Sequence, residues 1–227
     1  MGFPEADSSV LIPCQGVLFD NDGILISSIE SAERSWTKWA RMRDVDPEAM
    51  LKVMHGYRTV DTLTKLRPDL DLESEVQFVE DLQCADKEGL KVLPGVLDLL
   101  RALPRDRWTV VTSGTERLAR VRLAACGIPM PEKLVTAERV IWGKPHPEPF
   151  LAGAALLGFK PEECVVFEDS ASGVQAGRAA GCTVVATTFS HSADSLEEAH
   201  YVIEDLTSVS VEKAASGIVL RLGGLAG

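Results

Sequence analysis

Short apolar runs alternate with helical patterns along most of the 227 residues, and this alternation limits the folds available to the chain. Uninterrupted apolar runs are typical of parallel strands buried on both faces. Such runs occur at 16–19, 108–111, 164–167 and 183–186, with a weaker one at 134–135 and an edge-strand pattern at 201–203. The helical patterns between them end at Gly127, Gly158 and Gly181, as helices often do. The order predicts an α/β fold: a doubly wound, Rossmann-like parallel sheet with helices on both faces.

The segment from 29 to about 90 breaks the alternation, because it contains helical patterns and no strand-like run, and we place the bounds of the inserted unit at 29–92. We expect an all-helical cap of about four helices here, inserted after the first strand, and a core built from 14–28 and 93–227. Open α/β sheets bind ligands at the carboxyl ends of their strands, so the cap is a candidate lid over that edge. Trp36 and Trp39 lie on one apolar stripe and are expected in the core of the cap rather than as sugar-stacking platforms.

The composition narrows the choice of partners. The chain has 34 acidic and 23 basic residues and a net charge of −11, which disfavours binding to nucleic acid or to anionic lipid. No apolar stretch approaches the roughly 18 residues of a membrane span, and the N-terminus lacks a signal-peptide pattern. The five scattered cysteines include no CxxC pair and are expected as reduced thiols. We therefore expect a cytoplasmic protein, and a monomer, because no large apolar patch is evident.

Acidic pairs follow two of the predicted strands. Asp20 and Asp22 follow the first run, and Glu168 and Asp169 follow the run at 164–167. Each pair has a purely structural reading, as an Asx-rich turn or as the acidic start of a helix. The functional reading is that these carboxylates meet at one edge of the sheet. There they could hold a hard cation such as Mg²⁺ and supply a nucleophile and a proton carrier.

Two further motifs are expected at the same edge. Thr112, Ser113 and Gly114 end the run at 108–111 and could form either a helix N-cap or a small anion cradle. Lys144 lies between a glycine and a proline in the loop before a predicted helix. It is either a solvated loop lysine or a cation placed beside a phosphoryl group.

In their order and wording, these segments resemble the haloacid-dehalogenase-like hydrolase superfamily, and within it the phosphatases with a helical cap. The resemblance extends from about 16 to 188, and four motifs carry it: 19–25 (FDNDGIL), 111–115 (VTSGT), 143–149 (GKPHPEP) and 166–170 (VFEDS). The Thr-Ser-Gly-Thr run, the long Gly-Lys-Pro loop and the segment 55–59 are most similar to glycerol-phosphate and 2-deoxyglucose-6-phosphate phosphatases.

The resemblance implies a role for each acidic residue. Asp20 would be the nucleophile that forms an aspartyl-phosphate, and Asp22 would protonate the leaving alkoxide and then activate water. Mg²⁺ would be held by Asp20, by the backbone carbonyl of Asp22 and by Asp169, with Glu168 binding directly or through water.

The remaining roles concern the substrate. Thr112 and Lys144 would bind the phosphoryl oxygens, and Lys144 could also orient Asp20. Backbone N–H groups near Ser113 would assist, and the cap would contribute substrate contacts. The implied substrate-binding residues are Ser113, Gly114, His55 and Arg58.

The resulting hypothesis is a Mg²⁺-dependent phosphatase that acts on a small phosphorylated metabolite, a sugar or polyol phosphate. The main alternative is a sugar phosphomutase of the same fold, which would return the phosphoryl group to a second hydroxyl. A dehalogenase is disfavoured because its reaction needs neither a second aspartate nor a metal. A regulatory protein that kept only the fold is disfavoured because all four motifs are present.

Overall fold

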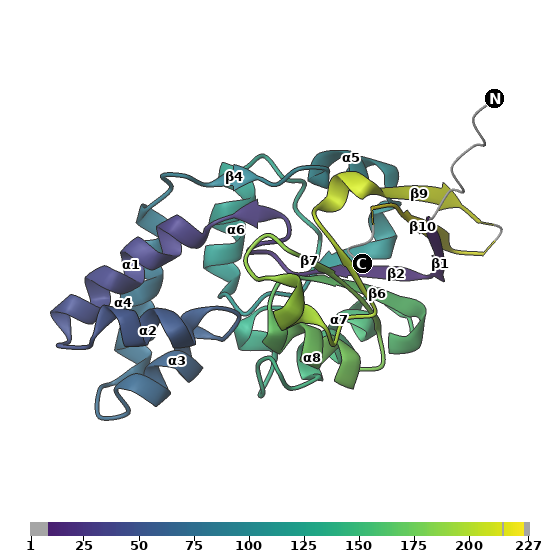
Figure 1. The fold of residues 1–227 in the computed structure, drawn as a ribbon. Coiled ribbons are helices and arrows are strands. Elements are labelled where there is room, and N and C mark those ends of the chain that lie inside the picture. The colour runs from purple at the N-terminus through teal and green to yellow at the C-terminus, as the bar shows by residue number, and fades with distance from the viewer. Residues whose placement is uncertain (1–8, 215, 225–227) are drawn as a thin grey trace.

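A parallel sheet of five strands forms the centre of the computed structural model, which describes residues 9–214 and 216–224 (Figure 1). Its strand order is β5-β2-β6-β7-β8, and every neighbouring pair is parallel. The strands are β2 (Gly16–Phe19), β5 (Trp108–Val110), β6 (Cys164–Glu168), β7 (Thr183–Thr187) and β8 (Tyr201–Ile203). They coincide with the predicted runs. The weak run at 134–135 contributes only an isolated bridge between Val135 and Val111.

Helices cover both faces of this sheet, so the doubly wound arrangement is confirmed. Along β2, Val17 and Phe19 point to one face, where they pack with α5 and α6, whereas Leu18 points to the other face and packs with α7 and α8. This alternation is expected of a strand buried on both sides. The four helices are α5 (Val96–Ala102), α6 (Glu116–Ala125), α7 (Glu148–Leu157) and α8 (Ala171–Ala179).

A second sheet was not predicted. It is antiparallel, with the order β1-β10-β9, and it packs against α5. Its strands are β1 (Val10–Cys14), β9 (Val209–Lys213) and β10 (Ile218–Leu222). The pairing of Val10 with Leu222 joins the two ends of the described chain. Such non-local pairing leaves no short-range pattern in the sequence, so these strands lay outside the predicted alternation.

Four helices fill the segment between β2 and α5: α1 (Ile29–Met42), α2 (Pro47–Met54), α3 (Thr59–Leu66) and α4 (Leu72–Ala85). They surround a hydrophobic cluster of their own that includes Trp39, Met50 and Leu63. Figure 1 shows them at one end of the molecule, with the antiparallel sheet at the other end. We refer to α1–α4 as the cap helices. The short strands β3 (Ile26–Ser27) and β4 (Lys91–Val92) pair where the chain enters and leaves them.

The remaining regular elements are short 3₁₀ turns at Arg105–Arg107, Ala137–Arg139, Pro161–Glu163, Ala193–Leu196 and Leu206–Ser208. All five cysteines are free thiols, as expected. Among the described residues, no helix has both the length and the apolar character that a membrane crossing requires.

Candidate active site

The predicted motifs meet at the carboxyl edge of the central sheet. Asp20 follows β2, Thr112 follows β5, and Glu168 ends β6. Lys144 reaches the same place from the loop before α7. Its ammonium donates hydrogen bonds to Asp20 Oδ1 at 2.5 Å, Glu168 Oε1 at 2.7 Å and the carbonyl of Val111 at 3.2 Å. Only 2% of Lys144 is exposed, so the reading of a solvated loop lysine is wrong.

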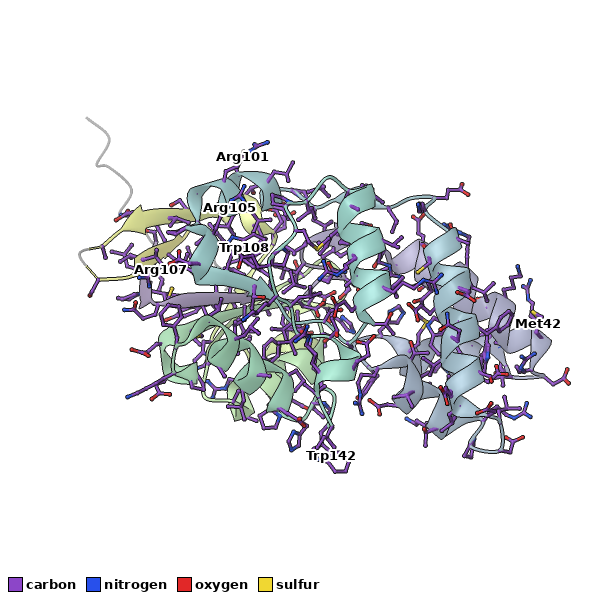
Figure 2. The ribbon with its side chains drawn as sticks, turned by 180° about the vertical axis from the view of Figure 1, so that it is seen from behind. Met42, Arg101, Arg105, Arg107, Trp108 and Trp142 are labelled. Carbon is purple, nitrogen blue, oxygen red and sulfur yellow. The ribbon has the colours of Figure 1, made fainter. Side chains whose placement is uncertain are left out.

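In the loop that carries Lys144, the lysine side chain points into the site, whereas an apolar side chain of the same loop points to the surface. Trp142, only two residues earlier, is 60% exposed and projects away from the body of the protein (Figure 2). Glu148 at the start of α7 accepts hydrogen bonds from the backbone N–H groups of Ile141 and Trp142 at 2.9 and 2.8 Å. These contacts tie the loop to the helix, which fixes the direction from which Lys144 enters the site.

Three buried carboxylates lie together beside Lys144. One oxygen of each of Asp20, Glu168 and Asp169 lies within 4.8 Å of the others. Glycines allow this close packing: a Cβ at Gly173 would lie 1.8 Å from Glu168 Oε1, and one at Gly23 would lie 1.8 Å from Asp169 Oδ2. The backbone N–H of Asp169 donates to Glu168 Oε2 at 2.9 Å and fixes that carboxylate.

The electrostatics of this cluster favour an additional cation. Burial raises the pKa of Asp20 to about 7, against the opposing effect of Lys144. Burial and the charges of Glu168 and Asp20 also raise the pKa of Asp169 well above its usual value. Burial alone would lower the pKa of Lys144, but the two neighbouring carboxylates raise it overall. One ammonium therefore faces three carboxylates, and this donor set of oxygens alone fits a hard divalent cation.

The Thr112–Gly114 turn forms one wall of the pocket. Thr112 Oγ1 accepts a hydrogen bond from the backbone N–H of Gly114 at 3.0 Å, and Ser113 Oγ donates to the carbonyl of Gly56 at 3.0 Å. The N-cap of α6 is Thr115, which accepts from the N–H of Leu118 at 3.2 Å. The side chains of Thr112 and Ser113 are therefore not needed for capping.

Asp22 lies beside the cluster and has a partner that was missed from the sequence. Its Oδ1 accepts hydrogen bonds from Ser28 Oγ at 2.5 Å and from Arg122 Nη1 at 2.7 Å. Arg122 is on α6, 100 residues away in the chain, and only 4% of it is exposed. A signal was present, because Arg122 falls on the buried stripe of α6, four residues after Leu118. An arginine in such a stripe needs an anionic partner.

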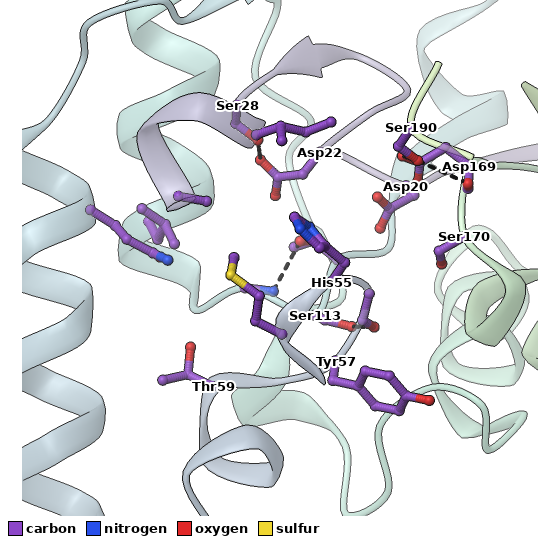
Figure 3. A pocket seen from close by; sticks show the side chains of 18 of the residues that line it. Asp20, Asp22, Ser28, His55, Tyr57, Thr59, Ser113, Asp169, Ser170 and Ser190 are labelled. Atoms are coloured by element: carbon purple, nitrogen blue, oxygen red, sulfur yellow. Dashed lines mark hydrogen bonds between the residues drawn. The ribbon is translucent and has the colours of Figure 1, made fainter. Parts of the chain in front are cut away.

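The cap helices and the core enclose a pocket of about 110 Å³ over these groups (Figure 3). His55, at the end of α2, lines it, and its Nε2 lies 3.5 Å from Glu33 Oε1. Burial lowers the pKa of His55, against the opposing effect of Glu33. Arg58 is not among the lining residues. Its guanidinium is bound to Asp61 and, at 3.2 Å, to the carbonyl of Val140.

Both tryptophans of α1 lie in the core of the cap helices, as expected, with their ring centres 5.5 Å apart. Trp39 donates to Glu75 Oε2 at 2.7 Å. Trp36 also lines the pocket. Ser190 and His191, in the loop after β7, line the pocket too, and Ser190 Oγ donates to Asp169. Nothing in the sequence marks that loop as part of a site.

A comparison with known families decides the classification. The family model for haloacid dehalogenase-like hydrolases matches residues 14–181. The chain is a haloacid dehalogenase-like hydrolase. It is 40% identical over 212 residues to hexitol phosphatase A of Escherichia coli, covering 91% of this chain and 98% of that protein.

A further relative of this hydrolase supports the classification, and a solved structure shares its fold. Glycerol-1-phosphate phosphohydrolase 2 of Saccharomyces cerevisiae is 39% identical over 187 residues, covering 76% of this chain and 74% of that protein. A crystal structure of a hydrolase from Pseudomonas syringae shares the fold, with a TM-score of 0.76 at 24% identity over 85% of this chain and 94% of that one.

Proposed function

We propose that this hydrolase is a Mg²⁺-dependent phosphatase of small sugar or polyol phosphate monoesters, acting through an aspartyl-phosphate. The observation that carries the proposal is the buried Asp20 carboxylate, held by Lys144 and placed near a second carboxylate, Asp22, in one pocket. The names of the relatives, a hexitol phosphatase and a glycerol-1-phosphate phosphohydrolase, agree with this substrate class. The pocket of about 110 Å³ suits a small leaving group.

In the first step, a carboxylate oxygen of Asp20 attacks phosphorus, and the bond between phosphorus and the ester oxygen breaks. The hydrogen bond from Lys144 engages Oδ1 and leaves Oδ2 to attack. Asp22 gives its proton to the departing oxygen, so the product is a neutral alcohol rather than a strongly basic alkoxide. Thr112 and the N–H groups of the 112–114 turn hold the phosphoryl oxygens.

In the second step, water attacks the phosphorus of the aspartyl-phosphate. Asp22, now a carboxylate, accepts a proton from that water, and the bond between phosphorus and Asp20 breaks to release phosphate. The hydrogen bonds from Arg122 and Ser28 hold the Asp22 carboxyl group in position beside Asp20. After this step Asp22 again carries a proton and Asp20 is again a free carboxylate, so the cycle is complete.

The carboxylates of Asp20, Glu168 and Asp169 are the residues that would hold Mg²⁺. Bound there, the cation would offset the repulsion between an anionic nucleophile and an anionic phosphate ester. The buried excess of negative charge beside Lys144 supports this assignment.

The proposal is tested by phosphate release from a panel of esters, with Mg²⁺ or with EDTA. The panel contains glycerol phosphates, hexitol and hexose phosphates, 2-deoxyglucose 6-phosphate, phosphoglycolate and p-nitrophenyl phosphate. Asp20→Asn is the test variant, and Asp98→Asn, which changes a salt-bridged aspartate on the surface of α5, is the matched control. We expect Mg²⁺-dependent release that Asp20→Asn abolishes and Asp98→Asn retains.

Three outcomes would contradict the proposal. No release from any ester would exclude a phosphatase of this class. Activity of Asp20→Asn above roughly a hundredth of wild type would exclude Asp20 as the nucleophile, because loss of a nucleophile costs far more than that factor. Conversion of glucose 1-phosphate to its isomer without phosphate release would identify a mutase instead.

A further inference from the structure

Two cap side chains on the pocket wall have polar groups without hydrogen-bond partners. Trp36 on α1 and Gln83 on α4 both line the pocket and are only 3% and 5% exposed. Within the described residues, neither the indole N–H of Trp36 nor the amide of Gln83 makes a hydrogen bond. Trp39 on the same helix, by contrast, has its N–H bonded to Glu75. The polar atoms of these two side chains are not themselves fully buried, because they open onto the pocket, where a ligand can supply the missing partners.

We propose that Gln83 and Trp36 recognise hydroxyl groups of the leaving alcohol, so that the enzyme selects a neutral polyhydroxylated ester over one carrying a second anionic group. This inference rests on the proposed phosphatase function. The phosphoryl group is bound by the core residues Asp20, Thr112 and Lys144. The alcohol part must therefore extend toward the cap helices, where both side chains lie.

The chemistry of the two groups favours hydroxyls. The Gln83 amide offers both a donor and an acceptor, and the Trp36 indole offers a donor beside an apolar ring. A hydroxyl can donate and accept, so a polyol chain satisfies both side chains while its CH groups contact the ring. A carboxylate or a second phosphate only accepts and would leave the Gln83 carbonyl oxygen without a donor.

The charges at the site argue against a second anion. Arg122 is paired with Asp22, and Lys144 is paired with Asp20 and Glu168. Burial lowers the pKa of His55, which disfavours its charged form. Arg122 and Lys144 thus already have carboxylate partners, although Nε and Nη2 of Arg122 are buried without a hydrogen bond. A second anionic group would share the pocket with the carboxylate of Asp22.

Three esters of equal chain length test the proposal: sorbitol 6-phosphate, hexyl phosphate and 6-phosphogluconate. Hexyl phosphate lacks all the hydroxyls, and 6-phosphogluconate replaces the far CH₂OH by a carboxylate. We expect wild-type kcat/KM for sorbitol 6-phosphate to exceed that for each of the other two by roughly 100-fold or more, since lost hydrogen-bond partners are strongly discriminated.

The variants are Gln83→Met and Trp36→Phe, which remove the polar groups and keep most of the volume. Gln77→Met is the matched control, since Gln77 is exposed on the same helix and bonded to Asp81. We expect Gln83→Met to lower the ratio of kcat/KM for sorbitol 6-phosphate to that for hexyl phosphate about tenfold, and Trp36→Phe several-fold. Gln77→Met should leave the ratio at its wild-type value. A partly unfolded variant would lose activity on both esters equally, so the ratio reports recognition alone.

The outcomes separate the inference from the function on which it rests. If the esters are hydrolysed but the ratio is the same in Gln83→Met, Trp36→Phe and wild type, the inference is wrong and the phosphatase stands. The inference is also wrong if 6-phosphogluconate is hydrolysed as well as sorbitol 6-phosphate. If no ester is hydrolysed, p-nitrophenyl phosphate included, the proposed function fails and the inference fails with it.

Discussion

Replacing Lys144 by methionine removes the one ammonium from the buried acidic cluster while keeping a side chain of similar length. The Lys144 Nζ lies 5.2 Å from the centre of the Phe150 ring, a contact that a methionine can retain in part. The variant therefore isolates the loss of charge. Without the ammonium, Asp20 and Glu168 face each other in a largely buried site.

Breaking a buried ion pair by removing one partner costs about 3–5 kcal/mol of the free energy of unfolding. For a chain of this size, 1 kcal/mol corresponds to about 2–4 °C in Tm. We therefore expect the metal-free Lys144→Met variant to melt about 6–20 °C below wild type. Mg²⁺ should recover much of this loss, because a divalent cation bound to the same carboxylates neutralises the charges that Lys144 no longer offsets.

The measurement is thermal unfolding of wild type and variant in EDTA and in saturating Mg²⁺. Lys38→Ala, on the exposed face of α1, is the control and should change Tm by no more than about 1–2 °C. A metal-free loss of less than about 2 °C would refute the electrostatic reasoning. So would a loss of equal size in EDTA and in Mg²⁺, since the carboxylates would then not be the metal ligands.

Two further predictions concern packing and pH. Gly173→Ala should lower Mg²⁺-dependent phosphatase activity at least about tenfold, because the new Cβ would lie 1.8 Å from Glu168 Oε1 and displace that carboxylate. A wild-type kcat/KM in this variant would contradict the proposal that Gly173 is needed to place Glu168. Hydrogen bonds from Arg43 lower the pKa of Glu75, so the charged pair stabilises the fold above the ordinary glutamate pKa and is lost as pH falls below it. Glu75→Gln should therefore unfold more readily than wild type at pH 7, with the difference shrinking toward pH 3 in denaturant titrations; a pH-independent difference would be evidence against the pair.

The strand ends were predictable because their signals are local. A buried parallel strand is a continuous apolar run, and Asp20, Thr112 and Glu168 are the polar residues at which such runs stop. The topology then brings those stops to one edge. Lys144 was identified from the glycine and proline that flank it, although the sequence alone left a solvated lysine open.

The residues that were missed depend on non-local contacts. Arg122 meets Asp22 across 100 residues of sequence, and Ser190 meets Asp169 only because β7 ends next to β6. The antiparallel sheet joins β1 to β10, at the two ends of the described chain. The local pattern around Ser190 and in the antiparallel sheet is that of an ordinary loop or short strand. The arginine on the buried stripe of α6 does indicate an anionic partner, but it does not identify which one.

For the same reason, the reaction class is easier to predict from the sequence than the substrate. The groups proposed for the chemistry lie on strand ends, where a polar residue after an apolar run is conspicuous. The groups proposed for recognition, Gln83 and Trp36, lie on helices whose buried stripes also form the core of the cap. In the sequence, a polar residue that faces the pocket cannot be distinguished from the other residues of an amphipathic helix. A reaction class can therefore be predicted from motifs in this fold. The leaving-group preference that we propose depends instead on which turn of α1 and α4 faces the cavity, and this is determined by how the four cap helices pack.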